Sequence, residues 1–214
     1  MELFAGLLDI VLRLDVHLGA LVRDYGAWVY AILFAVIFAE TGLVVTPFLP
    51  GDSLLFVAGA LAALGGLDVH LLFATLTLAA ILGNTTNYAI GRWLGRRFFD
   101  EGGSRWVKHE HLERTHAFYE RHGGMAVVIS RFLPIIRTYV PFVAGLARMG
   151  YASFTAYNIG GAVLWVAGLA YAGFFFGNLP WVRANLTFII LAIIVVSLVP
   201  LALAAWKARG EARP

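Results

Sequence analysis

The chain consists of long apolar runs separated by short polar interruptions. Residues 71–91 and 184–206 carry no charged side chain, and residues 149–182 are 34 uncharged positions in a row. Residues 26–45 form a further apolar run that contains one acid, Glu40. A transmembrane helix needs about 20 mostly apolar residues. The pattern therefore predicts an all-α integral membrane protein with four membrane-spanning helices.

Two further apolar segments, at about 44–66 and 125–148, are interrupted by proline. The interrupting residues are Pro47 and Pro50 in the first segment and Pro134 and Pro141 in the second. Each segment is too broken for one span and too apolar for an aqueous loop. Irregular backbone at membrane depth is tolerated only inside the protein or along a water-filled cavity. We therefore expect two re-entrant hairpins.

The two predicted hairpins share sequence. Phe48-Leu49-Pro50 recurs as Phe132-Leu133-Pro134, and Ala58-Gly59 recurs as Ala144-Gly145. A tyrosine and glycines at Gly-x-x-x-Gly spacing follow each hairpin, with Gly91 in the first copy and Gly173 in the second. Repeated, broken apolar segments are typical of transporters built as inverted repeats. The predicted fold is an inverted repeat of two units, each a re-entrant hairpin plus a transmembrane helix. The glycine spacing alone also fits simple close packing of helices.

Basic residues predict the orientation of the chain. Arginines and lysines concentrate in residues 92–122 and in the tail at 207–214, while the other connections hold few. Because basic loops stay on the cytoplasmic side, we expect both termini and residues 92–122 in the cytoplasm. The transmembrane domain then covers 25–206, and the hairpins enter it from opposite faces.

Residues 1–24 mix acids, arginines and leucines. They lack the uninterrupted apolar core and the cleavage site of a signal peptide. The leucine spacing predicts an amphipathic helix on the membrane surface. A short helix packed on the rest of the protein fits the same residues.

Four charged residues fall in or beside the predicted membrane segments: Glu40, Asp52, Arg131 and Arg137. Each costs roughly 2.5–3.5 kcal/mol on insertion scales, or about 10 kcal/mol together. We expect the hairpin tips to meet around a wet cavity, where the arginines bind a phosphate or other anion and the acids exchange protons. A structural salt-bridge network is the alternative explanation.

Pro50, Asn84 and Pro134 are further candidates for lining that cavity. Asn84 belongs to a polar cluster with Asn87, and such amides also simply hydrogen-bond between helices.

Several other functions find little support. The chain has no cysteine, and the histidines of residues 92–122 lack the spacing of a metal site. No nucleophile–base pair or phosphate-binding loop is present, so we expect no enzyme activity, no metal and no cofactor. The net charge is +3, and the basic residues lie between the apolar spans. In these positions they indicate membrane topology and contact with lipid headgroups rather than nucleic-acid binding.

The sequence of these segments resembles that of the DedA family of membrane proteins, also called the SNARE-associated or VTT-domain family. The matching motifs are Glu40-Thr41-Gly42, Pro47-x-x-Pro50-Gly51-Asp52, Ala58-Gly59, Tyr88-x-x-Gly91-Arg92, Arg131-Phe132-x-Pro134-x-x-Arg137, Pro141-x-x-Ala144-Gly145 and Asn158-x-x-Gly161-x-x-x-Trp165. The resemblance implies transport or scrambling of lipids, with undecaprenyl phosphate as the lipid in similar bacterial proteins. It also implies functional roles for Glu40, Asp52, Arg131 and Arg137. Many relatives place an acid where this chain has Asn84, which implies weaker proton coupling or coupling through Glu40 and Asp52 alone.

The leading hypothesis is a translocase or scramblase for a lipid phosphate, such as undecaprenyl phosphate or a phospholipid. Arg131 and Arg137 hold the phosphate, and Glu40 and Asp52 exchange protons. A proton-coupled carrier of small solutes or cations is the first alternative, and a membrane phosphatase or a purely structural protein are others. The lipid species, the direction of transport and the oligomeric state stay open.

Overall fold

The structure is a computed structural model of the 214-residue chain. It describes residues 14–43, 51–100, 124–133, 136–177 and 179–185, together with 188–189, 191–193 and 195. The predicted N-terminal residues 1–13, the polar residues 101–123 and the tail at 207–214 lie outside this part, as do Pro50 and Pro134.

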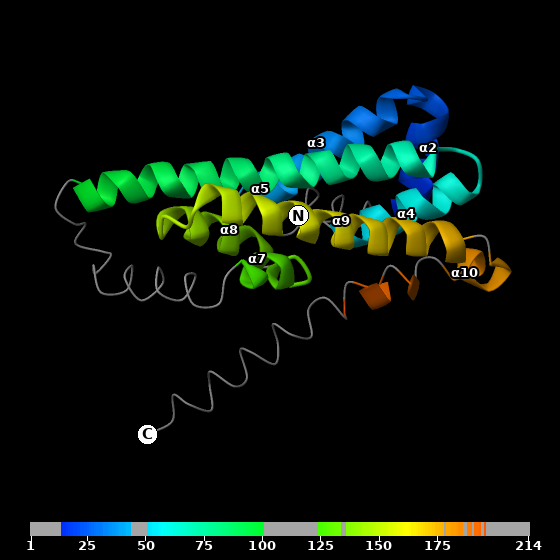
Figure 1. Cartoon of the computed structure of the whole chain (residues 1–214). Coiled ribbons are helices and arrows are strands. Elements are labelled where there is room, and N and C mark those ends of the chain that lie inside the picture. Colours follow the sequence, from blue (N-terminus) through cyan, green and yellow to red (C-terminus); the bar gives the residue numbers. More distant parts are fainter. Residues whose placement is uncertain are drawn as a thin grey trace, which may run out of the picture. The chain divides into compact units, whose positions relative to one another are not determined.

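Every regular element among the described residues is a helix, which confirms the predicted all-α class (Figure 1). In chain order they are α2 (Leu14–Tyr25), α3 (Trp28–Gly42), α4 (Gly51–Ala63), α5 (Val69–Asp100), α7 (Met125–Ser130), α8 (Ile136–Leu146), α9 (Tyr151–Phe176) and α10 (Pro180–Ala184).

Two of these helices are long and apolar enough to cross a membrane. The candidate spans are Val69–Gly95 in α5 and Tyr151–Phe176 in α9. They coincide with two of the four predicted spans. Helices α3 and α4 are apolar but shorter. Most of the predicted fourth span, at 184–206, lies outside the described residues.

The structure changes two details of the sequence interpretation. Helix α5 continues without a break to Asp100, so the polar segment predicted to begin at 92 starts within this helix. Pro141 does not break the second hairpin segment but lies inside α8. A proline in a helix removes the bond from its own N–H to the carbonyl four residues earlier, here that of Arg137, and its ring crowds that carbonyl. In α8 the residues on both sides of Pro141 are nevertheless helical. The helical path instead ends at Ser130, the end of α7, and residues 131–133 form a turn.

The chain divides into two compact units. Unit 1 contains residues 1–36, 49–76 and 166–214, and unit 2 contains residues 37–48 and 77–165. In unit 1, α2 packs against α4 and Leu18 is buried. For the described N-terminal residues this contact favours the packed helix over the surface helix.

Each unit contains a contact in which glycines bring two helices together. In unit 1, a Cβ atom added to Gly59 of α4 would collide with the carbonyl oxygen of Ala170 in α9, and one added to Gly173 would collide with that of Phe56. Only glycine allows two backbones to approach this closely.

Unit 2 repeats this contact between α8 and α5. A Cβ atom on Gly145 would collide with the carbonyl oxygen of Tyr88, and one on Gly91 with that of Phe142. In all four cases the carbonyl belongs to the residue three positions before the partner glycine. Each unit therefore holds its short helix on part of a long helix by the same reciprocal glycine crossing.

The apolar core of unit 2 surrounds this crossing. It contains Tyr88, Val127, Ala144, Ala147, Met149 and Phe154, contributed by α5, by α7 and α8, and by the chain from α8 into α9. The rings of Tyr88 and Phe154 stack with centroids 4.2 Å apart. The Tyr88 hydroxyl bonds to the carbonyl of Met149 and accepts a bond from Arg92. This packing fixes α8 and the start of α9 against α5.

Candidate functional site

Unit 2 buries three charged side chains. Glu40 lies in the last turn of α3, Arg131 follows α7 directly, and Arg137 lies in the first turn of α8. Their exposed fractions are 1%, 2% and 4%. Charged residues are almost never buried to this degree without compensating partners, so the contacts of each are informative.

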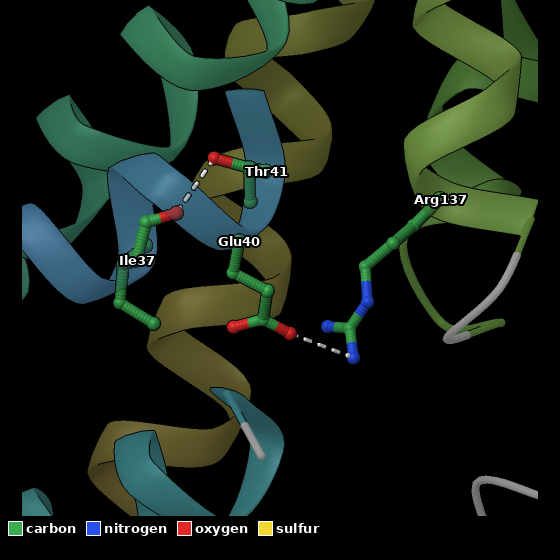
Figure 2. A network of polar contacts seen from close by, with 4 residues as sticks. All are labelled: Ile37, Glu40, Thr41 and Arg137. Carbon is green, nitrogen blue, oxygen red and sulfur yellow. Dashed lines mark hydrogen bonds and ion pairs between the residues drawn. The ribbon is translucent and has the colours of Figure 1, made fainter. Parts of the chain in front are cut away.

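Glu40 and Arg137 form an ion pair. The Nη2 atom of Arg137 lies 3.2 Å from the Oε1 atom of Glu40, and Figure 2 shows the two side chains pointing toward each other from α3 and α8. The guanidinium carbon of Arg137 also lies 5.2 Å from the ring centre of Trp165, within the range of a cation–π contact. Burial makes the pair costly to break on one side, because the remaining charge would be uncompensated.

Two polar neighbours fix the backbone around this ion pair. The hydroxyl of Thr41 donates to the carbonyl of Ile37 at 2.8 Å, as Figure 2 shows. The side-chain amide of Asn87 in α5 donates to the carbonyls of Thr138 at 2.6 Å and of Thr41 at 3.4 Å. Because Thr41 follows Glu40 and Thr138 follows Arg137, Asn87 links the two chain segments that carry the pair.

Arg131 has partners of a different kind. The short helix α7 ends at Ser130, whose hydroxyl bonds back to the carbonyl of Val127, and Arg131 follows as the C-cap. Its Nη2 atom donates to Oδ1 of Asn158 at 2.6 Å, with longer contacts to the carbonyls of Asn158 (3.4 Å) and Ala80 (3.3 Å). All three acceptors are neutral.

The Nε atom of Arg131 is buried and has no hydrogen-bond partner within the described part of the chain. A buried donor without an acceptor loses its hydration and gains nothing in return, at a cost of about 1–3 kcal/mol. Arg131 and Arg137 are also close enough for their positive charges to repel each other. This part of unit 2 thus has an unused donor and excess positive charge, which suit it to bind an oxyanion.

The other predicted site residues are distributed as follows. Asn84 is 2% exposed in α5 of unit 2 and follows Gly83, which packs closely against Thr41. Asp52 lies in the first turn of α4, in unit 1, and is partly buried. The predicted cavity residues Pro50 and Pro134 lie outside the described residues. Of the two alternatives for Asn87, the structure shows the hydrogen bonds between helices.

Sequence reasoning assigned no role to Asn158 or Trp165, although both lie in one of the matched motifs. The structure places each against an arginine of the site. Glu40 and the arginines were found in the sequence because burying a charge is costly. Asn158 and Trp165 carry no charge, so the same argument could not identify them.

Comparison with known proteins gives consistent results. Residues 49–175 match the VTT domain family. The chain is 54% identical to Protein DedA of Escherichia coli K12 over 202 residues, which are 94% of this chain and 92% of that protein. It is 44% identical to an uncharacterized membrane protein of Mycobacterium leprae over 83% of this chain and 80% of that one. It is 37% identical to the inner membrane protein YghB of Escherichia coli K12, over 73% and 72%. No solved structure matches the chain.

Proposed function

Because the chain belongs to the DedA family of membrane proteins, whose shared module is the VTT domain, we propose that it transports a phosphate-bearing lipid between the two leaflets of a membrane. Undecaprenyl phosphate and phospholipids are the candidate substrates. The phosphate head crosses inside the protein, while the hydrocarbon chain stays in the bilayer.

The contacts of Arg131 are the observation that carries this proposal. The side chain is 2% exposed, its described partners are neutral, and its Nε donor is unused. A protein that needed only a stable core would gain from an apolar side chain at this position. A buried arginine with spare donors is instead suited to a phosphate group, which accepts bonds in the geometry that guanidinium offers.

The Glu40–Arg137 pair supplies the second part of the proposed mechanism. The phosphate replaces Glu40 as the partner of Arg137, and Glu40 takes up a proton as the pair opens. This exchange couples lipid movement to protons without leaving either charge uncompensated. From the sequence we propose Asp52 as a second proton-coupling acid. The proposed partners are therefore a phosphate-bearing lipid and protons, and the protein is a transporter rather than an enzyme.

We further propose that the chain is an inverted repeat of two copies, each a re-entrant hairpin followed by a transmembrane helix, in a bacterial inner membrane. The matching glycine crossings, α4 on α9 and α8 on α5, support this repeat, in which each hairpin helix packs on the long helix of the other copy. Two relatives, YghB and YqjA of Escherichia coli, are named inner membrane proteins, and the chain has two candidate spans. The basic residues place both termini in the cytoplasm under this proposal.

Reconstitution tests the transport function. Purified protein in phosphatidylcholine liposomes should move labelled undecaprenyl phosphate or labelled phospholipid between leaflets faster than empty liposomes do. Arg131→Met should abolish the gain, because it removes the buried donors. Arg23→Met, which replaces an exposed arginine of α2, is the matched control and should behave as wild type. Wild-type rates equal to those of empty liposomes would refute the proposal.

The same liposomes distinguish the alternatives. Proton flux that requires a soluble solute, without lipid movement, would indicate a small-solute carrier. Release of inorganic phosphate from the lipid would indicate a phosphatase.

A further inference from the structure

One face of α9 contacts both buried arginines. Asn158, Gly161 and Trp165 lie three and four positions apart, which places them on the same side of the helix. All three are buried, with Asn158 0% and Trp165 1% exposed. Both arginines come from the α7–α8 segment. This face of α9 therefore meets the segment that carries the positive charge of the site.

Asn158 uses both ends of its amide. Its Oδ1 atom accepts the 2.6 Å bond from Arg131, while its Nδ2 atom donates to the carbonyl of Ile81 at 3.1 Å and to the hydroxyl of Thr85 at 3.3 Å. The two acceptors on α5 hold the amide in one orientation, with its oxygen toward the guanidinium. Among side chains of this size, only asparagine accepts and donates in this way.

The neutrality of this partner has a chemical consequence. A carboxylate at position 158 would accept the same bond from Arg131 but would also neutralise its charge. The amide fixes the guanidinium and leaves its full charge for an anion. Trp165 also contacts Arg137 without supplying a negative charge, because a cation–π contact orients the guanidinium through a neutral ring. The negative partner of Arg137 is Glu40 of α3.

Gly161 leaves room for the stem of Arg131. A Cβ atom at this position would lie 3.0 Å from Cδ and 3.2 Å from Nε of Arg131. Those distances are tighter than ordinary van der Waals contact, so a larger residue would shift Arg131, or the backbone of α7 at Val128 whose Cα is also 3.2 Å away, by a few tenths of an ångström. The crowded atoms of Arg131 include Nε, the donor that has no partner in the described part of the chain.

We propose that this face of α9 positions both arginines through neutral contacts, with Asn158 and Trp165 as the positioning residues and Gly161 as the space for Arg131. The arrangement holds the two guanidiniums in place without a negative charge from α9. The charge of Arg131 stays available to an oxyanion, and that of Arg137 becomes available when its pair with Glu40 opens. The identity of that oxyanion, a lipid phosphate, rests on the proposed function, whereas the positioning itself does not.

Asn158→Asp is the variant that separates positioning from structural support. It keeps an acceptor for Arg131 and nearly the same volume, but it adds a negative charge and lacks the donor that bonds to the carbonyl of Ile81. In phosphatidylcholine liposomes with labelled undecaprenyl phosphate, we expect folded Asn158→Asp to lose about tenfold or more of the transport rate, because the carboxylate neutralises Arg131 and weakens its charged hydrogen bond to the phosphate. Wild-type transport by folded Asn158→Asp would overturn the inference.

A double-mutant cycle tests the contact without any lipid. Thermal unfolding in detergent is compared for wild type, Asn158→Asp, Arg131→Met and the double variant. Because the carboxylate would pair with Arg131, Asn158→Asp should lower the melting temperature much more in the Arg131→Met background than alone. Additive effects would overturn the positioning role. If wild-type protein moves no lipid but the cycle shows coupling, the proposed function fails and the positioning stands.

Gly161→Ala gives a second, independent test and decides the matter if Asn158→Asp does not fold. Gly160→Ala is its matched control, because a Cβ at that neighbouring position meets nothing within 4 Å. Both changes raise helix propensity equally. We expect Gly161→Ala to slow transport several-fold and Gly160→Ala to leave it unchanged. Equal transport by the two variants would count against the inference.

Discussion

The two units of the chain share a helix crossing but differ in what they bury. Both hold a short helix on a long one through reciprocal glycines, at Gly59 and Gly173 in unit 1 and at Gly145 and Gly91 in unit 2. Among the described residues, the buried polar and charged side chains lie in unit 2, with Ser53 the exception in unit 1. The same backbone contact thus supports an apolar interior in one unit and a charged one in the other.

This difference separates what makes the fold from what makes the site. The glycine crossings are a property of the frame, and they recur whether or not charge lies nearby. The frame is the crossing of a short helix and a long helix that both units contain. Within the described part of the chain, only unit 2 adds to it the ion pair, Arg131 and the buried asparagines. Function then has to be argued from these added side chains, since the frame is common to both units.

The largest expected effect comes from breaking the frame itself. Gly59→Leu in unit 1 and Gly145→Leu in unit 2 should each prevent close approach of the two backbones, because a side chain has no space against a carbonyl oxygen. We expect losses of more than about 4 kcal/mol in each case, seen as poor recovery of monodisperse protein and low melting temperatures.

The controls for the frame are Gly160→Leu in unit 2 and Gly168→Leu in unit 1, where an added Cβ meets nothing within 4 Å. A large loss for only one of the two crossing variants would contradict the equivalence of the units.

The next effect concerns charge in unit 2 alone. Glu40→Gln removes the carboxylate that lies 3.2 Å from Arg137 and leaves that guanidinium buried. Removing one partner of a buried pair typically costs roughly 3–5 kcal/mol. Thermal unfolding of the single variant Glu40→Gln and of the double variant Glu40→Leu/Arg137→Leu tests whether the two side chains form a stabilising ion pair. The double variant should recover stability but not transport, and failure to recover it would argue against a simple pair.

A smaller loss is expected for Asn87→Ala. The change removes the donor that bonds to the carbonyls of Thr138 and Thr41, so both carbonyls lose a buried partner. A loss of roughly 0.5–1.5 kcal/mol per bond is expected from removing these hydrogen bonds. Thermal unfolding measures it, with Thr86→Ala on the same helix as control, since Thr86 bonds only within its own helix. Equal effects of the two variants would mean that Asn87 does not link the segments.

The smallest effect is expected at Ser53, the buried polar residue of unit 1. Its hydroxyl has no hydrogen-bond partner within the described residues. Ser53→Ala removes an unsatisfied group, so the melting temperature should stay the same or rise slightly. A clear loss of stability at Ser53 would show that unit 1 also depends on buried polar contacts and would weaken the contrast between the units.

The sequence predicted the frame well, because the frame follows from simple physical patterns. Apolar runs of membrane length located α5 and α9. The recurrence of Ala58-Gly59 as Ala144-Gly145 identified glycines that the structure places at equivalent crossings. Pro141 was wrongly taken as a break, since a single proline removes one hydrogen bond and α8 forms around it.

The site was predictable only where charge made it conspicuous. Glu40, Arg131 and Arg137 stood out because buried charge is costly. Asn158 and Trp165 are neutral, and only three-dimensional contacts link them to arginines more than 25 positions away in the sequence. Asp52 belongs to unit 1, so its predicted role with Glu40 stays a prediction.

The glycine crossings also restrict how each unit can move. Two helices that touch through their backbones cannot slide by one residue, because the shift would bring a side chain against a carbonyl oxygen. Rotation about the point of contact meets no such obstacle. Each crossing therefore acts as a pivot with a fixed register, and conformational change within a unit is expected to be angular rather than axial.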